Sequence, residues 1–165
     1  MEAAEEEHDE IAKSKVWKAI LRKDIPAAAK ILTSTWAMKK KANGEFRARI
    51  VARGYEQIDG QHYNSHDIAS PVTNDMTIRI IMILMIMAGW CGEILDVKGA
   101  FLHGQFENGK KLYMDIPEGF EHHYDPSKYV LFLLSTLYGL KNAAMAFWKE
   151  TLKCFKSMGV NLGLV

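Results

Sequence analysis

The sequence is poor in cysteine and in long apolar runs, and both absences exclude classes of protein. Its 165 residues include two cysteines, Cys91 and Cys154, which are too far apart to share a metal-ligand motif. Such cysteines are typical of reduced buried thiols in an intracellular protein and not of a disulfide framework. The six histidines, including the pair His122-His123, show no ligand spacing either. The longest apolar run, Ile80 to Ala88, is far shorter than the ~20 residues of a membrane span.

Lysine and arginine are absent from the first ten positions, which carry six acidic residues instead. This start has neither the basic nor the apolar part of a secretory signal, and we expect it to be disordered or the frayed start of a helix. Those ten positions hold six of the 20 acidic residues and none of the 21 lysines and arginines. Residues 11–165 therefore carry a clear excess of positive charge, although the net charge of the whole chain is only +1. A basic remainder favours a polyanionic partner.

The first half of the chain predicts one helix and one hairpin. The periodic apolar residues Val16, Trp17, Ile20 and Leu21 predict a helix over residues 11–21, ended by Pro26. Asn43-Gly44 predicts a type I′ turn, in which both central residues have positive φ. That turn joins residues 34–42 to residues 45–54 in a β-hairpin, and residues 57–72 follow as a loop.

The second half predicts alternating helices and strands. Asn74 or Asp75 caps a helix over residues 78–88 that stops at Gly89, and its nearly all-round apolar surface predicts packing under a sheet. Strands are expected over residues 93–97, 112–114 and 130–134. A last helix runs from Asn142 to Gly159. The pattern predicts one α/β unit.

The hairpin carries the densest basic charge. Arg47, Arg49, Val51 and Arg53 share one face of its second strand, and three arginines repel one another unless an anion lies across them. Phosphate suits the guanidinium fork, so we predict a phosphate-binding surface. The alternative is a solvated edge hairpin protected by its charge.

Asp96 is the most informative single residue. It ends the apolar stretch 93–97, where a desolvated carboxylate is costly unless it is paired or binds a metal. Its alternative role is to cap the turn that follows. Gly99 and Ala100 are small and leave their backbone N–H groups open to an anion, whereas Phe101 can equally be a core residue. Gly139, before the last helix, either admits a ligand or belongs to an ordinary turn.

Seven segments in order resemble one family, the reverse transcriptases of copia-type (Pseudoviridae-like) retrotransposons. The resemblance covers about residues 34–158, and its motifs are Thr35-Trp36-Ala37-Met38-Lys39, Arg47-Ala48-Arg49-Ile50-Val51-Ala52-Arg53-Gly54-Tyr55, Ser70-Pro71-Val72, Thr77-Ile78-Arg79, Leu95-Asp96-Val97-Lys98-Gly99-Ala100-Phe101-Leu102-His103-Gly104, Tyr113-Met114 with Pro117-Glu118-Gly119-Phe120, and Leu137-Tyr138-Gly139-Leu140-Lys141.

The resemblance implies a right-hand polymerase of α+β class. Residues 1–33 are then an acidic leader and helix, residues 34–75 a fingers hairpin, residues 76–158 a partial split-βαβ palm, and residues 159–165 a tail. It also implies RNA-directed DNA synthesis, an RNA or DNA template-primer and dNTP as partners, and other segments of a Gag-Pol-like polyprotein. The expected location is the cytoplasm or a virus-like particle, with no role for a membrane.

The resemblance also assigns site residues. It implies Asp96 as the first catalytic carboxylate and, with the Val97 carbonyl, as a ligand of two Mg²⁺ ions. Phe101 would be the steric gate against a ribonucleotide 2′-hydroxyl. The other residues implied to contact dNTP or template are Lys39, Lys41, Arg47, Arg49, Gly99, Ala100, Tyr138 and Gly139.

The sequence departs from the family pattern in two places. Asn142-Ala143-Ala144-Met145 stands where the family usually has Gln-Ala-Pro-Arg, and the sequence ends before a Tyr-Val-Asp-Asp motif. We therefore expect a fragment with one carboxylate for two Mg²⁺ ions, which by itself is an inactive polymerase. Two alternatives are a non-catalytic nucleic-acid-binding remnant and a fragment without a stable fold.

Overall fold

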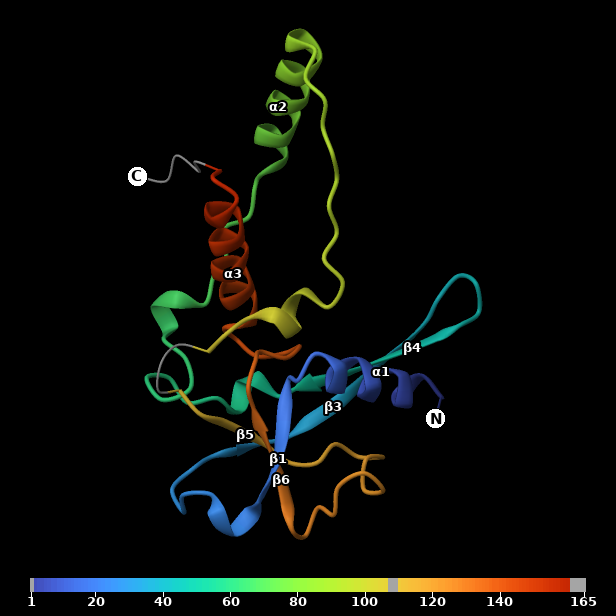
Figure 1. Cartoon of the computed structure of the whole chain (residues 1–165), viewed down its shortest axis with the longest axis vertical. Helices are drawn as coiled ribbons and strands as arrows, with labels where there is room; N and C mark the ends of the chain where they lie inside the picture. The colour runs from blue at the N-terminus through green and yellow to red at the C-terminus, as the bar shows by residue number, and fades with distance from the viewer. Residues whose placement is uncertain (1, 107–109, 161–165) are drawn as a thin grey trace.

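The structure is a computed structural model that describes residues 2–106 and 110–160. Within these ranges the chain forms three α-helices, a four-stranded sheet and a two-stranded hairpin (Figure 1). The predicted mixture of helix and strand is thereby confirmed. The elements are α1 (Glu2–Lys13), β1 (Trp17–Leu21), β2 (Ile31–Leu32), β3 (Ser34–Lys40), β4 (Phe46–Ala52), α2 (Asp75–Ala88), β5 (Leu112–Met114), β6 (Tyr129–Leu133) and α3 (Ala143–Ser157).

The four-stranded sheet has the order β1-β6-β5-β2 and joins both halves of the chain. β6 lies inside the sheet and runs antiparallel to β1 and β5, whereas β2 pairs with β5 in parallel. Val130, Leu131 and Leu133 of β6 are buried, as expected for an apolar inner strand. The predicted strands near residues 112–114 and 130–134 are confirmed.

Of the two expectations for the acidic start, the helix is the correct one: these residues form α1, which ends at Lys13 before Lys15 takes a positive φ of 51°. The prediction of a helix over residues 11–21 is wrong. The residues predicted to continue that helix form β1 instead, paired from Trp17↔Leu133 to Leu21↔Tyr129. The hydrogen bonds of β1 come from a strand far along the chain, so local periodicity gave no sign of them.

The hairpin is confirmed, but its turn differs from the prediction. Among the described residues the only non-glycine with positive φ is Lys15, so Asn43 does not adopt the left-handed conformation that a type I′ turn requires. The Gly44 N–H donates to the Lys41 carbonyl, and the Lys41 N–H donates to the Glu45 carbonyl. With φ of 88° at Gly44, this is the longer turn in which a single glycine takes the left-handed position.

The helix α2 begins and ends as predicted, but its predicted packing is wrong. Asn74 caps it by accepting the Thr77 N–H at 2.8 Å, and Gly89 ends it with φ of 65°. None of its described residues is buried, and Figure 1 shows it standing away from the sheet. The predicted strand at residues 93–97 is also wrong, because that segment has no regular structure and Ile94 is 99% exposed. A strand requires a neighbouring strand for its ladder, and no described strand pairs with this segment.

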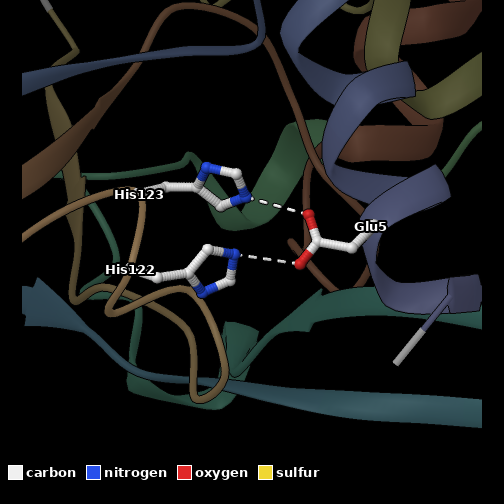
Figure 2. A group of neighbouring side chains, drawn as sticks. All are labelled: Glu5, His122 and His123. Carbon is white, nitrogen blue, oxygen red and sulfur yellow. Dashed lines mark hydrogen bonds and ion pairs between the residues drawn. The ribbon is translucent and has the colours of Figure 1, made fainter.

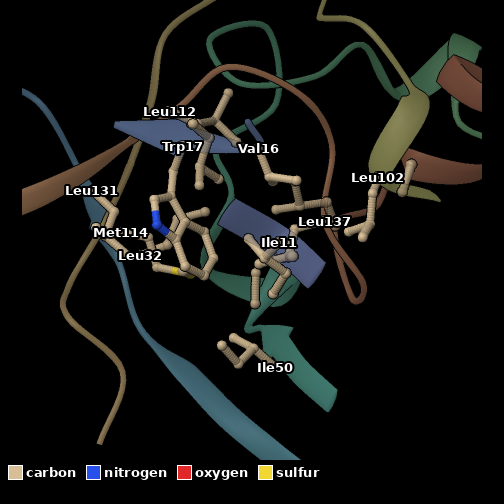
Figure 3. Close-up of a cluster of buried hydrophobic side chains, with 14 of the residues drawn as sticks. Ile11, Val16, Trp17, Leu32, Ile50, Leu102, Leu112, Met114, Leu131 and Leu137 are labelled. Atoms are coloured by element: carbon tan, nitrogen blue, oxygen red, sulfur yellow. The ribbon is translucent and has the colours of Figure 1, made fainter. Parts of the chain in front are cut away.

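The hydrophobic core lies where α1, the sheet and the inner face of β4 meet (Figure 3). Ile11 from α1, Val16, Leu131 and Leu137 are completely buried there. Ile50 enters from the hairpin, so the strand face opposite the arginines is the buried one. The predicted division of β4 into a basic face and an apolar face is confirmed.

The hairpin is held to the body of the protein by close backbone contacts. The Ala52 N–H donates to the Tyr138 carbonyl at 2.8 Å, and the Ile50 N–H donates to the Glu7 carboxylate of α1 at 3.4 Å. Gly139 has φ of 87°, and a side chain there would overlap the Ala52 carbonyl and the Val51 side chain. Glycine is required at this position for both conformation and space.

We predict that Gly139→Ala destabilises the protein more than Gly119→Ala does. Gly119 has a similar φ of 93° but open space around it, so its replacement reports the conformational cost alone. That cost is about 1 kcal/mol, and steric overlap adds about 1–3 kcal/mol at Gly139. Chemical denaturation of the two variants measures the difference, and equal losses would contradict the proposed close contact.

Candidate functional site

A cavity of about 540 Å³ lies between α1, the basic face of β4 and the loop that contains Asp96. Residues from four distant parts of the sequence line it. They include Glu6, Glu7, Glu10, Lys41, Arg47, Arg49, Asp96, Val97, Lys98, Gly99, Ala100, Phe101 and Tyr138. Most of the predicted site residues are therefore brought together, whereas Lys39 and Gly139 are not part of the lining.

Arg49 is the best-placed cation of this cavity. Its guanidinium lies over the Tyr138 ring, 4.7 Å from the ring centroid, which is a cation–π arrangement. Its Nε is buried and has no hydrogen-bond partner among the described residues. A buried donor without a partner is costly, so the Arg49 Nε is a hydrogen-bonding group that the described residues leave unsatisfied. Arg47, two residues earlier on the same strand face, is exposed.

The loop after Asp96 contributes aromatic and backbone groups. Gly99 has φ of 63° and precedes a short 3-10 helix, Ala100–His103. The Phe101 ring meets the Tyr138 ring edge-on, with centroids 5.8 Å apart. The Phe101 carbonyl accepts the Thr136 hydroxyl at 2.5 Å, which fixes this turn against the body of the protein.

Tyr138 and Gly139 act differently from each other. Burial raises the pKa of Tyr138, and its ring forms part of the cavity wall between Phe101 and Arg49. Gly139 instead packs against β4, so its position in the structure is explained by the close contact of two backbones. The alternative reading of Gly139 as part of a turn fits its place in the structure.

The acids of α1 are the site residues that sequence reasoning missed. Glu7 is buried and its carboxylate accepts the Ile50 N–H of β4 at 3.4 Å, while Glu10 pairs with Lys98 at 3.1 Å. Burial raises the pKa of Glu7, although Arg49 and Arg47 act in the opposite direction. The excess of acid at the start of the chain was visible in the sequence, but nothing local showed that it would face the basic hairpin.

Comparison with known proteins identifies the family. Residues 14–161 match the family described as "Reverse transcriptase (RNA-dependent DNA polymerase)". The chain belongs to this reverse transcriptase family. The prediction of a copia-type retrotransposon reverse transcriptase fragment is confirmed.

Relatives of this reverse transcriptase fragment are found in plants and yeast. It is 34% identical over 156 residues to the "Retrovirus-related Pol polyprotein from transposon TNT 1-94" of Nicotiana tabacum, covering 91% of the chain and 11% of the relative. It is 35% identical over 130 residues to the transposon RE2 polyprotein of Arabidopsis thaliana, covering 76% of the chain and 9% of the relative. It is 28% identical over 160 residues to the Ty1-NL2 Gag-Pol polyprotein of Saccharomyces cerevisiae, covering 94% and 8%.

The chain therefore spans about a tenth of the length of these polyproteins. No solved structure matches it. In the part of the chain that the structure describes, no helix combines the length and the apolar character that crossing a membrane requires.

Reverse transcriptases generally use divalent metal ions, but the surroundings of Asp96 do not fit a two-metal site. Asp96 is exposed and belongs to an irregular segment, not to the end of a buried strand as predicted. Among the described residues, the one group of three converging metal-ligand side chains is elsewhere, at Glu5, His122 and His123. The Lys98 side chain beside Asp96 in sequence pairs with Glu10, so Glu10 is already engaged by a cation.

We predict that Glu7→Gln stabilises the protein at pH 7. Because folding raises the pKa of Glu7, the charged carboxylate costs stability above that raised pKa, and the cost vanishes below the ordinary value of 4.5. The stability difference between variant and wild type should therefore shrink as the pH falls toward 4. Thermal unfolding over this pH range measures it, with the exposed Glu6→Gln as control. A difference that stays constant with pH would contradict the effect of burial.

Proposed function

We propose that this chain supplies the nucleotide- and template-contacting part of an RNA-directed DNA polymerase. In this proposal the hairpin β3–β4 is the fingers hairpin, and the Asp96 loop with α3 belongs to a partial palm. By itself the chain binds nucleic acid or dNTP without extending a primer. The observation that carries the proposal is the convergence of Arg47 and Arg49 with Asp96, Phe101 and Tyr138 on one cavity.

The cations of the cavity suit phosphate. Arg49 offers a buried Nε donor, and Arg47 and Lys41 add positive charge along the same wall. Charge-assisted hydrogen bonds from guanidinium to phosphate are stronger than neutral ones, and they lose less to solvent where the donor is already buried. Lys41 also pairs with Glu45 at 2.8 Å, so its charge is partly neutralised and Arg49 is the principal donor.

The opposite wall suits the rest of a nucleotide. Gly99 and Ala100 present backbone without bulky side chains, and the Phe101 and Tyr138 rings form an aromatic corner next to Arg49. Aromatic rings stack on bases of any sequence, which suits a polymerase that copies every template. In this proposal Phe101 also occupies the space that a ribose 2′-hydroxyl requires.

The isolated chain is proposed to lack the catalytic step. Two Mg²⁺ ions carry four positive charges, and Asp96 with the Val97 carbonyl offers one negative charge and one neutral oxygen. The α1 acids Glu6, Glu7 and Glu10 line the same cavity, but among the described residues they do not converge with Asp96 on a metal position. Mg²⁺ gives up its bound water reluctantly and requires more carboxylate than this. Binding by the basic hairpin needs no such site, so the proposal separates binding from chemistry.

We predict that Arg49→Ala weakens binding of an RNA template annealed to a DNA primer by about tenfold, the loss of roughly 1.4 kcal/mol from one charge-assisted contact. The plot of log affinity against log salt should also become less steep by about one, because one phosphate contact is lost. Fluorescence anisotropy at several salt concentrations measures both. The control is Arg79→Ala on α2, which removes the same charge from an exposed helix outside the cavity. An equal loss of affinity in both variants would show that only the net charge of the protein matters, and it would contradict a specific binding site at Arg49.

We predict no primer extension by this chain on an RNA template with Mg²⁺ and dNTPs. The assay is run beside Asp96→Asn, and anisotropy confirms that both proteins hold the template-primer. Extension that Asp96→Asn abolishes would show a complete metal site and would contradict the proposal that this chain binds without catalysis.

A further inference from the structure

We infer that Glu5, His122 and His123 form a zinc-binding site that clamps α1 to the loop between β5 and β6. Glu5 lies on α1, and the two histidines lie in the turn after Phe120, distant from Glu5 in the sequence (Figure 2). The site is separate from the cavity around Asp96, and the inference does not rest on the proposed polymerase function.

The three side chains already converge. Nε2 of His122 lies 3.0 Å from Oε1 of Glu5, and Nε2 of His123 lies 2.9 Å from Oε2 of the same carboxylate. Figure 2 shows both rings pointing at the carboxylate from one side. All three ligand positions are within 4.8 Å of one another. Tetrahedral Zn²⁺ holds its N and O ligands roughly 3.3 Å apart, so small movements of the side chains would admit the ion.

The turn that carries the histidines is firmly anchored. Phe120 is 1% exposed, and its carbonyl accepts the N–H groups of His123 and Tyr124 at 3.0 Å each. The Phe120 ring also meets the Trp36 ring edge-on, with centroids 5.5 Å apart. The ligands thus come from a turn fixed to the core and not from a free loop.

A fourth side chain orients His123. The buried His8 of α1 stacks on the His123 ring, with centroids 3.9 Å apart and the planes 1° from parallel. His8 lies one helical turn after Glu5, so the same face of α1 supplies both the carboxylate and the surface on which the second ligand rests. Supporting contacts of this kind hold metal ligands in place in known sites.

The ligand chemistry selects the ion. Two imidazoles and one carboxylate suit Zn²⁺ and leave a position for water, whereas Mg²⁺ prefers an all-oxygen site. The exposure of Glu5 and His122 gives the ion a path in from solvent. Ile11, near the C-terminal end of α1, already packs into the core. An ion bound at Glu5 would attach the N-terminal half of the helix to the 120–124 turn.

The test is a Zn²⁺ titration of the full chain, made without a histidine tag, in competition with a chromophoric chelator. We expect one Zn²⁺ per chain, not displaced by Mg²⁺. His122→Ala and Glu5→Gln should each weaken binding by at least about tenfold, the loss that even outer-sphere partners of a metal ligand produce. His66→Ala is the matched control, because His66 is exposed and lies outside the cluster. It should leave the affinity unchanged.

A second measurement reports the clamp itself. Zn²⁺ should slow hydrogen exchange of the α1 amides in the wild type and in His66→Ala, and should have no effect in His122→Ala. Because His122 is exposed, its replacement leaves the core intact and the test stands even if Glu5→Gln folds poorly. Absence of Zn²⁺ binding, affinity that does not respond to His122→Ala, or unchanged α1 exchange on binding would each overturn the inference.

Discussion

The contact between β4 and the turn at Tyr138-Gly139 is the constraint on which the rest of the site depends. The Ala52 N–H donates to the Tyr138 carbonyl, and Gly139 leaves space for the two backbones to meet. This contact places the Tyr138 ring beneath Arg49 and beside Phe101. The basic strand and the aromatic corner, which are distant in the sequence, thereby line the same cavity.

Charge balance is the second organising feature. The cavity collects Arg47 and Arg49 from the hairpin, and α1 brings Glu6, Glu7 and Glu10 to the same space. Each acid lowers the cost of holding the arginines close together, but it also competes with any phosphate that enters. Keeping these acids charged inside the cavity also costs stability. At Glu7, burial raises the pKa even though Arg49 and Arg47 are nearby. The site is therefore balanced between internal pairing and binding of an anion.

The surroundings of Asp96 are less ordered than the part of the cavity formed by Arg49, Phe101 and Tyr138. The preceding segment and α2 expose apolar side chains, with Leu95 79% and Ile86 82% exposed. A carboxylate at the end of such a segment is not oriented by a sheet, and catalytic groups require that support to hold their geometry. The basic and aromatic part of the site is preformed in this chain, while the position of its acid is not.

The sequence by itself determined the family, the hairpin, the ends of α2 and α3, and the two faces of β4. These follow from local chemistry: Asn74 and Gly89 cap a helix, and alternation along β4 separates arginines from apolar residues. Only the tertiary structure decided that residues 17–21 are a strand, that residues 93–97 are not, and that α1 lies beside the basic hairpin. It also decided that Glu5 meets His122 and His123, which sequence spacing did not suggest. The physical reason is the same in each case, because strand pairing and side-chain clusters depend on partners distant in the chain, and no local pattern records them.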